Sequence, residues 1–293
     1  MPAGGRPTMR SRRLGAALRR YREAAKLDQQ HAADHIMGSK TKISRIESGQ
    51  VTARPGDVRL MLELYGVEDR EVHQRLEQLA RDSNKRGWWL DFPWVVKNEG
   101  FADFVTLETD ATYIRTWQSL FIPGLLQTDD YIRTLMDLSL TVHSPEAIRE
   151  AVAIRQTRRK TIEEGGAQYA AVIWEPALTA PMPSRKRHRD QLLHIYDVAQ
   201  RPNVSVQVLP FSEWQTAHLS SHFVMFNFDS EPAPQAVAYD TTSSTVLLED
   251  SEDMAKHVQI FETLRSAAHT PNESLAFLRK TITGIPEDRA EEK

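Results

Sequence analysis

Apolar residues recur with a helical period through the first 82 residues of the chain. Between Arg12 and Lys26 they fall on one face of a helix, at Leu14, Ala17, Leu18, Tyr21 and Ala25. Further stretches with this period begin or end at capping residues such as Asp28, Ser39 and Gly49. The pattern predicts five short helices, at about residues 12–26, 29–36, 40–48, 55–65 and 69–82.

From about residue 101 the pattern changes to a mixture of strand and helix periods. An extended run at 112–122 and five later apolar runs have the alternation or composition of strands. The last three runs lie close together with polar turns between them, which predicts antiparallel neighbours. We therefore expect a multidomain protein of class α and α+β. An all-α five-helix head would precede a larger α/β domain with a mixed, mostly antiparallel sheet and flanking helices.

These changes of pattern divide the chain into five segments. Trp88, Trp89 and Trp94 stand close together between the two patterned regions. Their clustering predicts a connector that packs onto the second domain. The expected segments are a disordered basic arm (1–11), a helical domain (12–82), a Trp-rich connector (83–100), an α/β domain (101–284) and a charged tail (285–293).

The composition excludes several classes of protein. The chain has 293 residues and no cysteine, so disulfide bonds, thiolate metal sites and cysteine catalysis are excluded. No apolar run approaches the roughly 20 residues of a membrane helix. The basic N-terminus has no apolar segment behind it, which argues against a secretory signal. We expect a cytoplasmic protein with no membrane partner.

Charge is unevenly distributed along the chain. Residues 1–60 contain 13 lysines and arginines against 5 acidic residues, a formal charge of 13 − 5 = +8. The remainder has 37 − 13 = 24 basic and 40 − 5 = 35 acidic residues, a formal charge of −11. A basic head on an acidic body indicates that only the head binds a polyanion.

The polar side of the predicted helix at 40–48 carries the candidate contacts to such a polyanion. These residues are Ser39, Lys40, Thr41, Lys42, Ser44 and Arg45. Lysine and arginine can bond guanine, and a threonine methyl can pack on the thymine methyl of DNA. A solvated basic face on a protein-binding helical domain is the alternative.

The stretch "LDQQHAADHIMGSKTKISRIESG", from Leu27 to Gly49, resembles the phage-repressor-type (XRE) helix-turn-helix family. The resemblance implies that the helix at 40–48 is a recognition helix that enters the major groove of DNA. It also implies a structural ion pair between Arg22 and Glu47. Lys26 and Met37 stand where glycine is usual in that family.

Residues around this helix are expected to position the DNA backbone. Gln29, at the start of the second helix, can anchor a phosphate or fix a neighbouring side chain. Phosphate contacts position a protein, whereas base contacts give it sequence preference. The arginines expected at phosphates are Arg10, Arg12, Arg13, Arg19 and Arg54.

The resemblance continues through the larger domain. "YIRTWQSLFIPGLLQTDDYIRTLM", "REAVAIRQTRRKTI" and "VIWEPAL" resemble a family of actinobacterial regulators that join an XRE-type head to a large domain of unknown function. The resemblance covers about Leu14 to Ile282. Members are treated as transcription regulators, are often encoded beside a very small partner protein and have been classed as toxin–antitoxin-like.

Six residues of the larger domain are candidates for a ligand or partner site: Trp117, Arg155, Gln156, Arg159, Trp174 and Glu175. Arg155, Gln156, Arg158 and Arg159 form a basic face on the helix at 145–163. This face favours either an anionic ligand or surface ion pairs with Glu150, Glu163 and Glu164. The tryptophans favour either a pocket or a buried aromatic core.

The sequence gives little support for an enzyme. His218, His222 and Glu213 have the residue types of a metal site, but they lie in a loop and a strand without an HExxH helix. The sequence contains neither a G-x-S-x-G nucleophile motif nor a G-x-x-x-x-G-K-[ST] phosphate loop. We expect no catalytic residues, no metal and no cofactor.

These observations predict a sequence-specific DNA-binding transcription regulator. Its expected partners are double-stranded DNA and a second copy of the chain, on two half-sites about one helical turn apart. The larger domain is expected to sense a small protein encoded by an adjacent gene or a small-molecule effector, or to dimerise. The alternative is an antitoxin-like module that neutralises a small partner protein and binds DNA for autoregulation.

Overall fold

The structure, a computed structural model, describes residues 8–83, 85, 87–138, 144–228, 236–240 and 245–286. These residues form two compact units, divided after Leu90. The division falls inside the segment 83–100 that the sequence assigns to a connector. Residues 1–7 of the expected arm and residues 287–293 of the expected tail lie outside the described residues.

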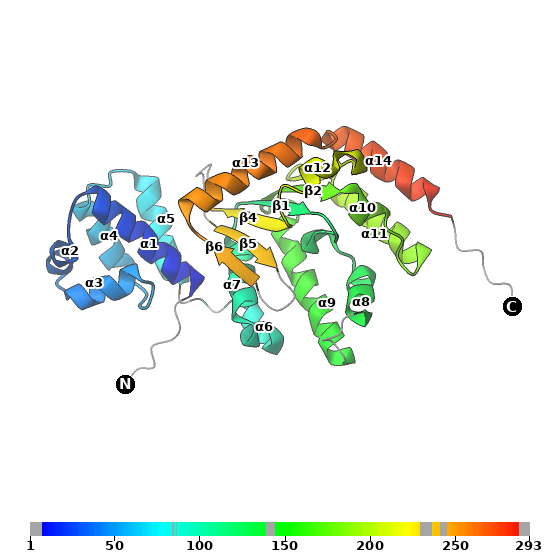
Figure 1. The fold of residues 1–293 in the computed structure, drawn as a ribbon. Helices are drawn as coiled ribbons and strands as arrows, with labels where there is room; N and C mark the ends of the chain where they lie inside the picture. Colours follow the sequence, from blue (N-terminus) through cyan, green and yellow to red (C-terminus); the bar gives the residue numbers. More distant parts are fainter. Residues whose placement is uncertain are drawn as a thin grey trace. The chain divides into compact units, whose positions relative to one another are not determined.

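The N-terminal unit is a bundle of five helices, which confirms the predicted number and order (Figure 1). The helices are α1 (Met9–Ala24), α2 (Gln29–His35), α3 (Lys40–Glu47), α4 (Pro55–Leu64) and α5 (Arg70–Asp82). The side-chain oxygens of Asp28, Ser39 and Asp69 accept hydrogen bonds from the first turns of α2, α3 and α5. Such caps stabilise a helix start by about 1 kcal/mol.

The first helix begins earlier than the sequence pattern predicts. α1 starts at Met9, and the Thr8 hydroxyl accepts a hydrogen bond from the backbone N–H of Ser11 at 3.1 Å. Met9 and Ser11 are buried, and Ser11 Oγ donates to the carbonyl of Gly49 at 2.8 Å. Residues 9–11 therefore belong to the helical unit and not to a disordered arm, because their side chains complete its packing.

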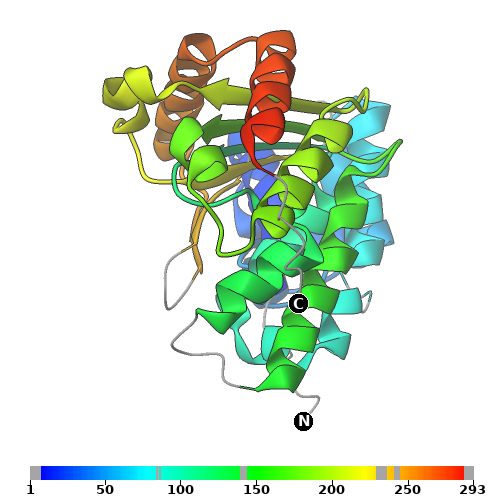
Figure 2. The same ribbon diagram turned by 90° about the vertical axis from the view of Figure 1, so that its right-hand side faces the viewer.

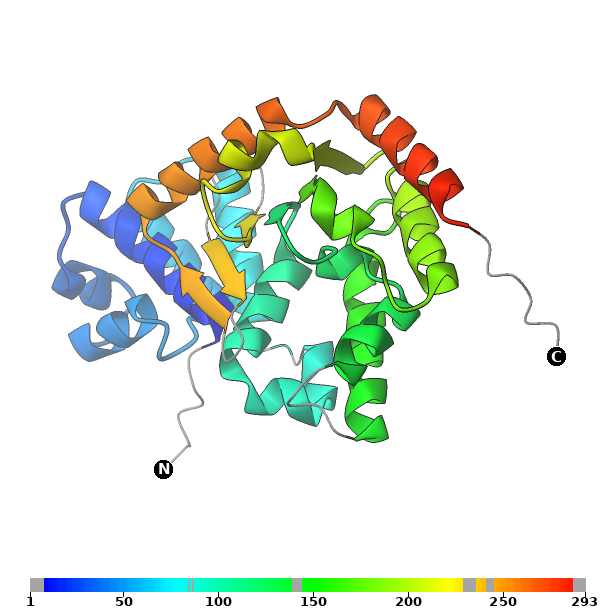
Figure 3. The ribbon, with the colours of Figure 1, turned by 45° about the vertical axis from the view of Figure 1, so that its right-hand side comes forward.

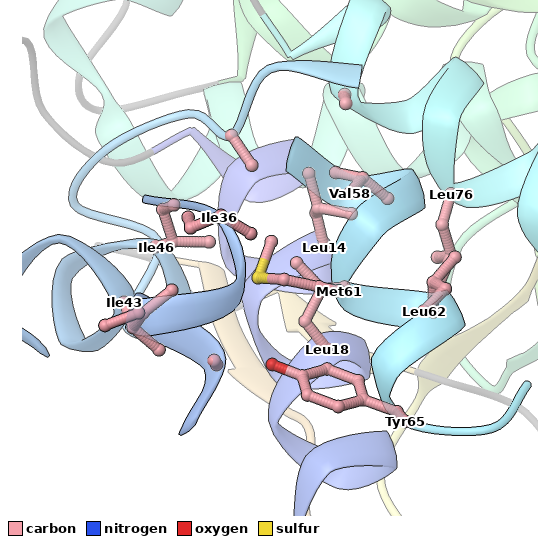
Figure 4. Close-up of a cluster of buried hydrophobic side chains, with 14 of the residues drawn as sticks. Leu14, Leu18, Ile36, Ile43, Ile46, Val58, Met61, Leu62, Tyr65 and Leu76 are labelled. Atoms are coloured by element: carbon pink, nitrogen blue, oxygen red, sulfur yellow. The ribbon is translucent and has the colours of Figure 1, made fainter. Parts of the chain in front are cut away.

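One apolar core holds the five helices together. Leu14 and Leu18 of α1, Ile43 and Ile46 of α3 and Met61 of α4 are at most 1% exposed and converge in the middle of the unit (Figure 4). Burying a side chain of this size stabilises the fold by roughly 1.5–3 kcal/mol. Ile43 and Ile46 are the apolar residues of α3, so their burial leaves the polar side of that helix outside.

Two glycines allow α1 to lie directly on the end of α3. A Cβ added to Gly15 would stand 2.3 Å from the carbonyl oxygen of Ile46, and one added to Gly49 would stand 2.7 Å from the Cα of Arg12. Gly49 also has φ +73°, the left-handed conformation that glycine adopts without strain. A larger residue at either position would push the two helices apart.

Lys26 and Met37 adopt the same left-handed conformation without being glycine, with φ +57° and +50°. These are the two positions at which the resembling helix-turn-helix family usually has glycine. The turns therefore keep a glycine-type conformation although the side chains differ. The strain costs about 1 kcal/mol per residue.

The C-terminal unit contains one six-stranded mixed sheet with the order β3-β2-β1-β4-β5-β6. Its strands are β1 (Tyr113–Gln118), β2 (Gln168–Trp174), β3 (Val204–Leu209), β4 (Phe223–Asn227), β5 (Ala236–Asp240) and β6 (Thr245–Leu248). β1, β2 and β3 pair in parallel, whereas the β1–β4, β4–β5 and β5–β6 pairs are antiparallel. The predicted mixed, mostly antiparallel sheet is confirmed.

The remaining helices include the predicted flanking helices of this sheet. They are η1 (Trp88–Asp91), α6 (Pro93–Lys97), α7 (Glu99–Asp110), η2 (Gly124–Leu126), α8 (Asp129–Asp137), α9 (Pro145–Arg159), η3 (Lys160–Ile162), α10 (Glu175–Thr179), α11 (Arg185–Val198), η4 (Phe211–Glu213), α12 (Trp214–Ala217), α13 (Ser251–Ala267) and α14 (Pro271–Gly284). Two short helices, η1 and α6, lie in the segment predicted as a connector.

Helices cover both faces of the sheet. On one face, Phe261 of α13 belongs to a buried cluster with Trp117 and Phe223. On the other face, Phe104 of α7 meets Phe226 of β4 edge-on, with 5.4 Å between the ring centroids. Figure 2 shows α13 and α14, in orange and red, above the strands and the green helices below them. Figure 3 shows α13 and α14 following one another along the same side.

The outer edge of β3 is covered by the connection between α13 and α14. The backbone N–H of Val208 donates to Ser274 Oγ at 2.9 Å, and its carbonyl accepts from the N–H of His269 at 2.9 Å. The side-chain amide of Gln207 donates to the carbonyl of His269 at 2.9 Å. These bonds satisfy an edge that would otherwise be open to pairing with another chain.

None of the helices in the described part of the chain is long and apolar enough to cross a membrane.

We expect Met37→Gly to stabilise the protein by about 0.5–1 kcal/mol, because glycine takes a positive φ without strain. The Met37 side chain is 92% exposed, so removing it loses little packing. The thermal unfolding midpoint measures the effect. Met37→Ala is the control, since it removes the same side chain but keeps the strained Cβ. A glycine variant no more stable than the alanine variant would contradict the left-handed turn.

Candidate nucleic-acid interface

The outer face of α3 presents a compact set of polar side chains. Ser39, Lys40, Thr41, Ser44 and Arg45 are exposed. They lie opposite Ile43 and Ile46 because residues one turn apart share a face of a helix. Ser39 Oγ accepts the backbone N–H of Lys42 at 3.2 Å, so the start of the helix is fixed. The face offers two cations and three hydroxyls within two helical turns.

Lys42 is placed differently from the other predicted contacts. Its side chain is 38% exposed, and its Nζ lies 2.7 Å from Asp57 Oδ2 at the start of α4. The ion pair neutralises the lysine charge and ties α3 to α4, although such a partly exposed pair contributes only about 0–1 kcal/mol. The structure therefore gives Lys42 a bracing contact that its position in the sequence does not reveal.

The ion pair between Arg22 and Glu47 is present and almost fully buried. Arg22 Nε and Nη2 donate to the two carboxylate oxygens of Glu47 at 2.6 and 2.9 Å, and each residue is 8% exposed. Arg22 Nη1 also donates to the carbonyl of Leu27 at 2.8 Å. The hydrogen bond to Glu47 raises the pKa of Arg22. The pair thus links α1 with the end of α3 and with the turn before α2.

Gln29 takes the second of its two predicted roles. Its side-chain amide donates to Glu47 Oε2 at 2.9 Å, so it fixes a neighbouring side chain. Burial, and next the nearby charge of Glu47, raise the pKa of Tyr65, the residue that follows α4, to about 12. Glu47 is therefore the acceptor around which α1, α2 and α3 are assembled.

The arginines expected at phosphates divide into two groups. Arg54, which precedes α4, is exposed and makes no side-chain cap. The others have contacts within the unit. Arg10 donates to the carbonyl of Asp82 at 3.1 Å, and Arg19 lies 2.8 Å from Glu23. Arg12 and Arg13 are half-buried and also engaged within the protein. The apolar period of the sequence cannot distinguish the exposed arginine from those with contacts inside the unit, because it gives no information about contacts between different helices.

The larger unit does not bring its six candidate residues into one site. Trp117 is fully buried in the sheet, and its indole N–H donates to the carbonyl of Ser220 at 3.1 Å, so it is a core residue. Trp174 is half-buried and stacks on Phe211 with 5.8 Å between centroids. Glu175 accepts the backbone N–H of Phe211 at 2.8 Å.

The basic face of α9 binds the end of the loop before α8 and the first residue of α8. Arg155 Nε donates to Gln127 Oε1 at 3.1 Å, Gln156 bonds Asp129, and Arg159 Nη2 lies 2.9 Å from Asp129 Oδ1. From the sequence, the expected ion-pair partners of this face were glutamates. One of them, Glu150, instead accepts a hydrogen bond from the backbone N–H of Trp94 at 2.9 Å. These contacts give the three residues a structural role.

One member of the basic segment on α9 is buried rather than on the surface. Arg158 is 7% exposed, and its Nε and Nη2 donate to Glu108 of α7 at 2.7 and 2.8 Å.

Among the described residues no group of three or more acidic, histidine or cysteine side chains could hold a metal ion. His218, one of the three residues considered for a metal site from the sequence, instead has its Nδ1 2.6 Å from the carbonyl oxygen of Trp214.

Two family models match the chain. The model of a helix-turn-helix domain matches residues 13–76, and the model described as "Domain of unknown function (DUF5753)" matches residues 101–280. Nothing among the curated proteins or the solved structures matches the chain. The first match contains α2 and α3 and supports a DNA-binding regulator.

We expect Glu47→Ala to destabilise the protein by about 3–5 kcal/mol, because it leaves the Arg22 guanidinium buried without its carboxylate. Urea denaturation followed by helical circular dichroism measures the loss. Glu146→Ala is the control: the side chains of the Arg149–Glu146 pair are 62% and 72% exposed, so its loss should cost far less. Equal losses in the two variants would contradict the buried role of the Arg22–Glu47 pair.

Proposed function

Because the chain belongs to the family of the domain of unknown function (DUF5753) and carries a helix-turn-helix domain, we propose that it is a sequence-specific transcription regulator of the XRE type. The proposal assigns α3 to the major groove of DNA. The observation that supports it most directly is the exposed set of Lys40, Thr41, Ser44 and Arg45, held outward by the burial of Ile43 and Ile46.

The chemistry of this face suits base edges. Arg45 and Lys40 can donate to the O6 and N7 acceptors of guanine, and the methyl group of Thr41 can pack on thymine. Arg54, exposed before α4, can bond a phosphate and position the unit without reading sequence. Gln29 and Lys42 act indirectly, because they hold Glu47 and Asp57 and so fix the helix that carries the reading residues.

A regulator of this kind binds DNA most effectively as a pair of units. One short recognition helix covers only a few base pairs, and two half-sites about one helical turn apart multiply both affinity and specificity. We therefore assign double-stranded DNA and a second copy of the chain as partners. Sedimentation of the protein with and without its DNA site tests this arrangement, and a monomer bound to each half-site alone would contradict it.

The larger unit is the candidate for control of the DNA-binding unit. Several large apolar side chains are exposed where β1 and β3 end, namely Leu120, Phe121, Phe211 and Trp214. Because β1 and β3 are both parallel to β2, these residues lie toward the same end of the sheet, at the carboxyl-terminal ends of the parallel strands. Exposed apolar groups at one end favour a protein contact. A small protein from an adjacent gene is the proposed occupant, and an antitoxin-like role is the second candidate function.

Co-expression separates the two functions. If the adjacent gene product arrests growth when produced alone and this chain relieves the arrest, the antitoxin-like role holds. If the adjacent product only changes the affinity for DNA, the chain is a regulator that senses a protein. Absence of any complex between the two purified proteins would contradict both forms of the partner assignment.

Selection of bound sequences from a random DNA library tests DNA recognition directly. We expect the wild-type protein to enrich one motif and Arg45→Ala to lose preference at one position of each half-site. A good base contact contributes about 1–3 kcal/mol, so the affinity for the selected site should fall roughly 5- to 150-fold. Titration of labelled DNA at fixed salt measures this change.

The control for that experiment is Arg70→Ala, which removes one exposed positive charge from α5. It should lower the affinity for all sequences by a small, uniform factor because it changes only the overall field. Failure of the wild-type protein to enrich any motif, at low as well as moderate salt, would contradict the proposed function.

A further inference from the structure

The described part of the chain contains three buried arginines, and two of them are matched to a carboxylate. Arg22 bonds Glu47 and Arg158 bonds Glu108, in each case through Nε and Nη2 to the two oxygens of one glutamate. The third, Arg115 in the middle of β1, is 5% exposed and thus the most buried of the three. No carboxylate of the described residues lies within ion-pair distance of it.

In Arg115, only one of the two guanidinium nitrogens that bind a carboxylate in Arg22 and Arg158 makes a hydrogen bond. Its Nη2 donates to the side-chain oxygen of Asn227 on β4 at 3.0 Å, whereas its Nε is buried and has no acceptor among the described residues. A neutral amide therefore accepts from Nη2 of Arg115, where in the other two arginines a carboxylate accepts from both Nε and Nη2. Burying a cation without a counter-charge is costly. Consistent with this, desolvation lowers the pKa of Arg115.

Aromatic contacts do not explain the missing acceptor. The guanidinium of Arg115 lies 5.2 Å from the ring of Tyr113 and 6.0 Å from that of Phe261. Arg158 has equivalent contacts, 5.5 Å from Phe101 and 5.1 Å from Phe104, and still bonds a glutamate. At Arg158, therefore, cation–π contacts accompany a carboxylate and do not replace it.

Two charged side chains of α13, Arg265 and Glu262, lie near Arg115. Tyr113 is half-buried, and the Arg265 side chain on α13 is 46% exposed and close enough for its charge to lower the pKa of Arg115. The nearby carboxylate, Glu262, is held 2.8 Å from Arg265 Nη2. Glu262 is thus paired with Arg265 and not with Arg115; both residues belong to α13, the helix that lies along this face of the sheet (Figure 1).

We propose that Arg115 is the charge-recognition group of a site for a small anion, a carboxylate or a phosphate group, between β1 and α13. An oxygen of the anion supplies the acceptor that Nε lacks. Tyr113, the half-buried ring beside the guanidinium, is the side chain that moves to admit the ligand. The site lies wholly within the larger unit, so it stands independently of DNA binding.

Thermal unfolding of the full chain, followed by tryptophan fluorescence, tests the site. Trp117, Trp174 and Trp214 all lie in the larger unit and therefore report its unfolding. The probes are inorganic phosphate and succinate, each compared with sodium chloride at equal ionic strength. We expect at least one probe to raise the unfolding midpoint of the wild-type protein by about 2–4 °C.

Arg115→Met should abolish this shift, and Arg115→Lys, which keeps the charge but loses the fork, should reduce it. Lys186→Met is the control: it removes a positive charge from a side chain 74% exposed on α11 and should keep the full shift. A shift with phosphate alone identifies a phosphate group as the ligand, and one with succinate alone a carboxylate. No shift in the wild-type protein, or an equal shift in Arg115→Met, would overturn the proposal.

Discussion

The burial of Ile43 and Ile46 against α1 is the constraint on which the candidate DNA interface depends. These side chains fix which side of α3 is inside, and hence which of its polar groups stay outside. The backbone contact at Gly15 brings the two helices together, and the Arg22–Glu47 pair holds the end of α3. Because successive residues of a helix are about 100° apart, a turn of α3 by one position would direct Lys40 and Arg45 away from any base edge.

The sequence predicts most of the N-terminal unit because its signals are local. Caps at Asp28 and Ser39 and the apolar period give the helices and their order. The contacts of Lys42 with Asp57 and of Gln29 with Glu47 join residues on different helices, so neither period nor cap reveals them. The exposed face of α3 is therefore predictable, whereas the division between side chains that brace the helix and side chains left for DNA is not.

The larger unit shows the limit of periodicity more clearly. Apolar alternation locates the strands, and short polar turns correctly predict that β4, β5 and β6 are antiparallel neighbours. The central position of β1 between β2 and β4 depends on crossovers and long-range pairing, which no local pattern encodes. That position also explains why Trp117 is core, because α13 covers the face of this central strand on which Trp117 lies.

The arginines of α9 show that helical spacing also carries information about which charged residues are buried. Arg158 lies four residues after Ile154 and four before Ile162, and both isoleucines are buried, so helical spacing already places it on the inner face. Arg155 and Arg159 fall on another face, where they bond Gln127 and Asp129. A charged residue in register with apolar neighbours therefore predicts a buried cation that needs a partner. The same test, applied to the alternation of β1, places Arg115 on the face of Trp117, and its partner is the one that the described residues do not supply.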